Sequence, residues 1–192
     1  MTFELDSPAS PSALPESGAR VTRTEHGVHR VELWGTMPVA WLGNFTRGAT
    51  SLGLDIVRGH ARRGAQRQWT AHFDLGGPRT LELERTDFLR LAREPSEQLG
   101  SSELRLYGFE LVRSSAREGA LELRLRAPDR TGFLAALLEH LAGFVLFPEE
   151  ININTFGQEA QDTLLLSSVA GQSPTAELEE AVRASLRACT RA

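Results

Sequence analysis

The chain has 192 residues, 41% of them hydrophobic and 24% charged, and a formal net charge of −4. This composition is typical of a folded protein of one large domain or two small ones, and it excludes extended disorder over most of the chain. The negative charge argues against broad binding to the nucleic-acid backbone, which draws its affinity from clustered positive charge. No apolar run is long enough to span a bilayer, and the N-terminus lacks the basic and apolar parts of an export signal, so we expect a cytoplasmic protein.

The 21 lysine and arginine positions are all arginine. A phosphate-binding P-loop and pyridoxal phosphate both require a lysine, which excludes simple kinases, ATPases and transaminases. Cys189 is the only cysteine, so the chain can form neither an internal disulfide nor a multi-thiolate zinc site. We therefore expect no cofactor and no metal.

The first half of the chain alternates expected strands with two expected helices. Residues 1–18, which are rich in Pro, Ser and acidic side chains, are expected to be a flexible tail. An apolar stripe at helical spacing from Trp41 to Leu52 predicts an amphipathic helix that ends at Gly53. The expected elements of this half are strands at 21–25, 28–34, 54–57 and 69–73 and helices at 41–52 and 88–92.

The same order of elements recurs after about ninety residues, which indicates an internal repeat. The alternation of apolar and polar residues slips at Gly108, which suggests a bulged strand over 103–113. An apolar stripe from Phe133 to Val145 predicts a helix, and Pro148 is expected to end it. The other expected elements are strands at 120–127, 151–153 and 164–166 and a helix at 178–189.

This order predicts an α+β fold of two ferredoxin-like modules, each an antiparallel sheet with helices on one face. We place the modules at 19–99 and 100–192. In the interpretation that we favour, both are circularly permuted ββαββα units, and the strands at 20–25 and 103–113 lie beside the next strand of their own module. In the alternative, the strand at 103–113 closes the first module and the second keeps an open edge.

The corner that follows the strand 120–127 resembles that of the ACT domain. It has the sequence Ala127-Pro128-Asp129-Arg130-Thr131-Gly132, and an apolar helix, the strand start Ile151-Asn152-Ile153 and the hairpin residue Asp162 follow it. ACT domains are regulatory modules that commonly bind free amino acids at an interface between two copies, and the resemblance implies that role here. The link 146–150 is longer than is usual in the family. The first half matches in spacing, but its loop Met37-Pro38-Val39-Ala40 lacks the polar motif.

The candidate ligand-binding residues are Asp129, Arg130, Thr131, Gly132 and Asn152. The N–H groups at a helix start carry partial positive charge and can bind a carboxylate, and Arg130 can hold one with two parallel hydrogen bonds. Asp129 can accept from an ammonium group, and Asn152 can bond to either end of an amino acid. In the alternative interpretation, Asp129 or Thr131 caps the helix, Gly132 permits close packing and Arg130 is solvated.

The remaining clusters are expected to be structural. Four arginines of one hairpin could hold an anion, but such a run is more often a solvated hairpin tip. They are Arg58, Arg62, Arg63 and Arg67. The histidines lack the acidic or thiolate ligands that would complete a metal shell, and no nucleophile, base and orienting group can be assembled.

We therefore expect a non-enzymatic regulatory protein, a homodimer in which an ACT-like module senses a free amino acid and controls an unidentified partner protein. The alternative is a protein-interaction or dimerisation scaffold that has no small-molecule ligand. RNA binding on the sheet would need exposed aromatic side chains, where the strand 120–127 offers Glu122, Arg124 and Arg126. We expect no membrane partner.

Overall fold

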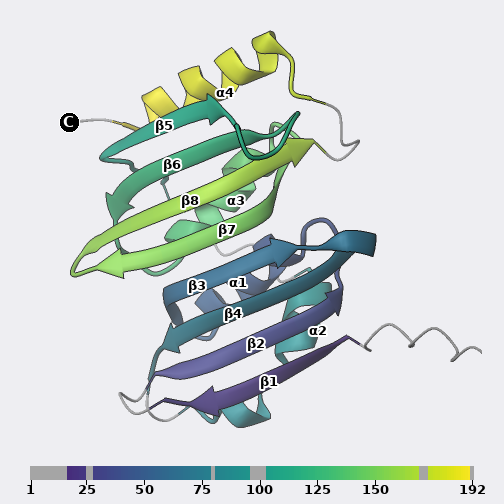
Figure 1. The fold of residues 1–192 in the computed structure, drawn as a ribbon. Helices are drawn as coiled ribbons and strands as arrows, with labels where there is room; N and C mark the ends of the chain where they lie inside the picture. Colours follow the sequence, from purple (N-terminus) through teal and green to yellow (C-terminus); the bar gives the residue numbers. More distant parts are fainter. Residues whose placement is uncertain (1–16, 25–27, 79–80, 96–102, 169–172, 191–192) are drawn as a thin grey trace, which may run out of the picture.

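The computed structural model describes residues 17–24, 28–78, 81–95, 103–168 and 173–190. They form one eight-stranded antiparallel sheet with helices on one face and the other face open (Figure 1). The predicted tail 1–18 lies outside the described residues except for its last two, and Gly18 already begins the first strand. No helix of the described part is long and apolar enough to cross a membrane.

Each half of the chain contributes four strands and two α-helices in the same order. The first half contains β1 (Gly18–Arg23), β2 (His29–Thr36), α1 (Trp41–Ser51), β3 (Asp55–Arg63), β4 (Gln68–Gly76) and α2 (Phe88–Arg93), with short 3-10 turns at Ala65–Arg67 and Leu83–Arg85. The second half contains β5 (Gly108–Arg113), β6 (Leu121–Pro128), α3 (Phe133–Ala142), β7 (Leu146–Phe156), β8 (Glu159–Ser168) and α4 (Ala176–Ala188).

The strand order across the sheet is β1-β2-β4-β3-β7-β8-β6-β5. The order β1-β2-β4-β3 of the first half is repeated as β5-β6-β8-β7 in the second, so both modules are permuted ferredoxin-like units, as favoured from the sequence. The alternative, in which the strand near 103–113 closes the first module, is wrong because β5 pairs with β6 and forms the far edge of the sheet.

Residues 103–107 do not belong to the strand that the sequence predicted. The strand begins at Gly108 and pairs with β6 without a register shift, and just before it the N–H of Tyr107 donates to the carbonyl of Arg126, the residue opposite Gly108 (2.8 Å). Two residues thus face Arg126 where the sequence predicted a bulge. Leu106 is buried instead, and its N–H donates to the carbonyl of Cys189 at the end of α4 (2.9 Å). The alternation slips at Gly108 because Leu106 bonds to the end of α4, whereas Tyr107 is already bonded to the sheet.

The helix α3 ends at Ala142, earlier than the apolar stripe to Val145 predicted. Val145 is 55% exposed and has a positive φ of 57°, a conformation that β-branched residues rarely adopt. The following strand β7 begins at Leu146 and includes Pro148, where the register with β8 shifts. A proline lacks an N–H for the ladder and is tolerated at such an irregularity. The long link 146–150 is therefore strand.

The two modules meet along β3 and β7. These strands pair antiparallel from Arg58 opposite Asn154 to Arg62 opposite Glu150, and α1 packs beside α3 on the covered face. We call this the seam. In the first module, Gly59 of β3 lets the ring of Phe73 lie so close that a Cβ at Gly59 would be 2.4 Å from Phe73 Cδ1. Phe73 in turn stacks on Phe45 of α1, with ring centroids 4.6 Å apart.

Candidate functional site

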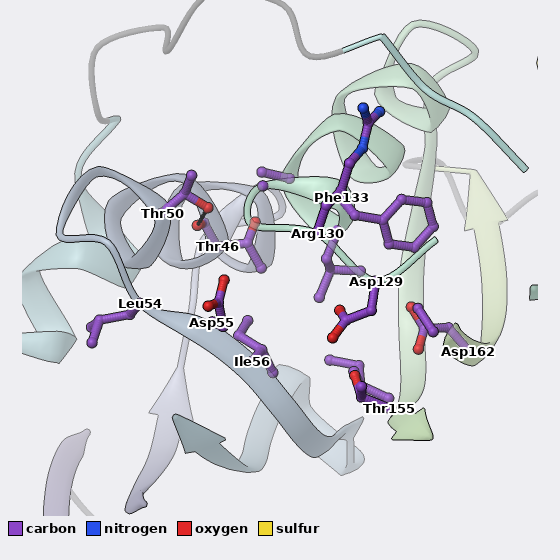
Figure 2. Close-up of a pocket in the computed structure, with 15 residues that line it drawn as sticks. Thr46, Thr50, Leu54, Asp55, Ile56, Asp129, Arg130, Phe133, Thr155 and Asp162 are labelled. Atoms are coloured by element: carbon purple, nitrogen blue, oxygen red, sulfur yellow. Dashed lines mark hydrogen bonds between the residues drawn. The ribbon is translucent and has the colours of Figure 1, made fainter. Parts of the chain in front are cut away.

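A crevice lies at one end of the seam, where the corner between β6 and α3 faces the first module (Figure 2). The first module contributes side chains from α1 and the start of β3, and the second contributes the corner, the first turn of α3 and the ends of β7 and β8. We call it the acidic crevice. Its polar side chains are Thr46, Thr50, Asp55, Asp129, Arg130, Thr155 and Asp162.

Three aspartates from three different segments give the crevice its negative charge. Figure 2 shows Asp129 between Asp55 and Asp162. The hydroxyl of Thr131 donates a hydrogen bond to the carboxylate of Asp55, which ties the corner to the start of β3 in the other module. Among the described lining residues Arg130 is the single cation, so the crevice favours a positively charged group.

Burial changes the acidity of two of these aspartates. Asp162 is only 2% exposed, and burial raises its pKa to about 7, with a small contribution in the same direction from Asp129. The N–H of Asn154 donates to Asp162 at 3.4 Å and opposes that rise. The pKa of Asp129 is also raised, first by burial and then by the nearby Asp55, while a hydrogen bond with Thr155 lowers it. The crevice therefore gains negative charge as the pH rises through neutrality.

The start of α3 is not capped by a side chain. Gly132 occupies the N-cap position with a φ of 84°, a left-handed conformation in which glycine is not strained. The N–H of Phe133 donates to the carbonyl of Arg130 (3.0 Å). The interpretation in which Asp129 or Thr131 serves as the cap is therefore wrong, because these side chains bond to Thr155 and Asp55 instead.

Four of the five predicted residues lie together at this corner. Asp129, Arg130 and Gly132 line the crevice, and Thr131 bridges the modules at its edge. The guanidinium of Arg130 points away from the carboxylates (Figure 2), and its Nε and Nη2 atoms are shielded from solvent without a hydrogen-bond partner. Arg130 is therefore not the solvated side chain of the alternative interpretation.

Asn152 does not join the other predicted residues. Along β7 the buried Ile151 and Ile153 face the helices, so Asn152 between them lies on the open face of the sheet, paired with His60 and Thr163 of the neighbouring strands.

Sequence reasoning missed Asp55 and the two threonines of α1 as part of this site. Asp55 belongs to the module whose own corner lacks the polar motif, and the repeat alone does not show that β3 lies beside β7. The sequence spacing aligned Leu54-Asp55-Ile56 with Ile151-Asn152-Ile153, but Asp55 is the first residue of β3, whereas Asn152 lies in the middle of β7.

The acidic crevice has a volume of about 30 Å³. A cavity needs about 10–15 Å³ of this kind to hold one water molecule, whereas pockets for drug-sized ligands measure about 300–1,000 Å³. In this conformation the crevice therefore has room for a group the size of an ammonium but not for a complete amino acid. Among the described residues, no group of three or more His, Cys, Asp or Glu side chains is placed to hold a metal ion.

Comparison with known proteins adds little to this geometry. No family model and no curated protein matches the chain. Among solved structures, an aspartate kinase from Synechocystis is similar, with 14% sequence identity and a TM-score of 0.45. The match covers 83% of the present chain and 26% of the kinase, and it bears on neither the activity nor the ligand of the present chain.

Proposed function

We propose that the chain is a non-enzymatic regulatory protein of the ACT-like type, which binds a free amino acid at the acidic crevice and signals to a partner protein. The observation that carries the proposal is the contact between Thr131 and Asp55, because it makes one crevice from two modules of the same chain. A ligand at this position touches both modules and can change how they meet.

The charges of the crevice suit the two ends of an amino acid. Asp55 and Asp129 supply carboxylates for its ammonium group. The pKa of Asp129 is raised first by burial and then by repulsion from Asp55, and a cation relieves that repulsion. The unpartnered guanidinium nitrogens of Arg130 and the uncapped first turn of α3 supply donors for its carboxylate. Charge-assisted hydrogen bonds of this kind are about twice as strong as neutral ones.

The small volume of the crevice gives the proposal a mechanism. An amino acid fits only if the corner moves away from the start of β3, which breaks the hydrogen bond between Thr131 and Asp55. The ligand thus selects an open arrangement of α1 and α3. The free energy by which it shifts the equilibrium between the closed and open arrangements can be no larger than the difference between its binding free energies for the two. We propose that the regulated partner, or a second copy of the chain, recognises this arrangement.

The test is a thermal-shift screen of the purified chain with each of the twenty free amino acids. One or a few should raise the unfolding temperature in a concentration-dependent way, because they bind the folded state alone. The Asp129→Asn variant and the Asp55→Asn variant should each abolish the shift. Asp74→Asn is the matched control, because Asp74 is an aspartate bonded to Arg30 away from the crevice, and this variant should keep the shift.

Absence of a shift with all twenty amino acids would refute amino-acid sensing and leave the scaffold function. A shift that persists unchanged in both crevice variants would place the ligand elsewhere in the molecule.

A further inference from the structure

A second crevice lies at the opposite end of the seam, where β3 ends and β7 begins. It has a volume of about 240 Å³, and both modules line it. The loop 37–39 and the hairpin between β3 and β4 contribute from the first module, and the beginning of β7 and the end of β8 contribute from the second. We call it the basic crevice, because its charge is opposite to that of the acidic crevice.

A buried glutamate organises one wall of the basic crevice. Glu149 is 6% exposed, and its Oε1 accepts from Arg63 Nη1 (3.1 Å) and from the Ser167 hydroxyl (2.7 Å). Its Oε2 is paired with Arg117. Both oxygens are thus engaged, so Glu149 is not available to a ligand, and its charge is more than balanced by the two guanidinium groups.

Arg67 is the cation of this crevice that lacks a partner. Within the described part of the chain it makes no hydrogen bond and no ion pair, although it lines the crevice. With Gln66 it forms a turn in which both residues have positive φ values, 54° and 60°. The hairpin was predicted to be a solvated tip. Arg58, Arg62 and Arg67 are exposed, as predicted. Arg63 is half-buried and binds Glu149 of the second module, and the exposed Arg62 pairs with Glu150 (3.6 Å).

Apolar side chains line much of the rest of the basic crevice, beside Thr36, Ser167 and Ser168. Met37 and Trp69 are buried in the first module, and Phe147 and Pro148 face them from the second. Ligand pockets for drug-sized molecules measure about 300–1,000 Å³, so a volume of about 240 Å³ suits a small molecule with a single ring or a short branched chain. Among the described lining residues, the guanidinium groups of Arg63 and Arg67 against the carboxylate of Glu149 leave a net charge of +1.

We infer that the basic crevice binds a small monocarboxylic acid with an apolar body. The carboxylate pairs with Arg67, and the apolar body lies between Met37 and Phe147 of the two modules. An amino group is not required, because the one carboxylate among the described lining residues is already neutralised by Arg63 and Arg117. This inference is independent of the proposed function, which concerns the other end of the seam and a ligand with an ammonium group.

The test uses benzoate as the probe and isothermal titration calorimetry of the full chain as the measurement. Benzoate should bind, and its neutral analogue benzamide should bind at least about tenfold more weakly, because a hydrogen-bonded charge pair contributes about 1.5–3 kcal/mol. The Arg67→Gln variant should weaken benzoate binding by a similar factor. Arg62→Gln is the matched control from the same hairpin and should leave the affinity within about twofold.

Two further measurements separate this site from the acidic crevice. The Asp129→Asn variant should bind benzoate like the unchanged chain, whatever its response to amino acids. Isovalerate should compete with benzoate, because the inference requires a carboxylate and an apolar body rather than an aromatic ring. The inference is overturned if neither acid binds at millimolar concentration, if benzamide binds as well as benzoate, or if Arg67→Gln has no effect.

Discussion

Asp162 is the buried residue whose replacement should change stability most clearly with pH. Its pKa rises from an ordinary value of 3.8 to about 7 in the folded chain, mainly because of burial. At about 1.36 kcal/mol per pH unit, this rise corresponds to roughly 4 kcal/mol. The folded state binds a proton at Asp162 more tightly than the unfolded state does. The contribution of this proton to stability is therefore fully present below pH 3.8 and is lost as the pH rises through about 7.

The Asp162→Asn variant keeps a neutral polar group at this position at every pH. Its free energy of unfolding should therefore exceed that of the unchanged chain at pH 8, and the difference should widen by roughly 3 kcal/mol between pH 5 and pH 8. Urea denaturation followed by tryptophan fluorescence at the two pH values measures it. A difference in the free energy of unfolding that does not change with pH would refute the inference that burial opposes ionisation of the Asp162 carboxyl. A variant less stable than the unchanged chain at pH 8 would refute it too.

Asp74→Asn is the control for this experiment because the shift has the opposite sign. The hydrogen bonds from Arg30 (2.7 and 2.9 Å) lower the pKa of Asp74. The stability that this pair contributes is present above pH 3.8 and is lost as the pH falls through the lower folded pKa. The Asp74→Asn variant should therefore be less stable than the unchanged chain by the same amount at pH 5 and pH 8.

Two stability predictions concern other parts of the fold. Val145→Gly should raise the free energy of unfolding by about 1 kcal/mol, since glycine removes the cost of a β-branched residue in a left-handed conformation. Urea denaturation measures this change, and a loss of stability would contradict the prediction. Glu149→Gln should lower the free energy of unfolding by about 2 kcal/mol, because Arg63 and Arg117 lose their charged partner. Glu150 is more exposed, so Glu150→Gln should lower it by under about 1 kcal/mol. Equal effects of the two glutamate variants would contradict the buried network.

The sequence predicted local structure well because local structure depends on periodicity. The apolar stripe of α1 and the alternation of β6 follow from residue spacing alone, and the internal repeat was sufficient to predict two modules of the same topology. The errors fall where tertiary contacts override the pattern. Leu106 continues an alternating run but packs on α4, and Val145 continues a helical stripe beyond the end of α3.

The candidate site could be predicted only in the half that carries a motif. The corner from Asp129 to Gly132 is contiguous in sequence, so the resemblance located it, but the facing residue Asp55 is brought there by pairing of β3 with β7. Asn152 was predicted to join the ligand residues, but it lies between the buried Ile151 and Ile153 and so faces the open side of the sheet. The basic crevice has no motif, since Arg67 and Glu149 lie far apart in sequence.

The pairing of β3 with β7 within one chain has a consequence for how a response would depend on protein concentration. Two separate copies must find each other before they share a crevice, and dilution removes the shared surface. Here a covalent tether holds both halves, so the encounter is intramolecular and its effective concentration is fixed. Assembly of either crevice should then be the same from scarce to abundant protein.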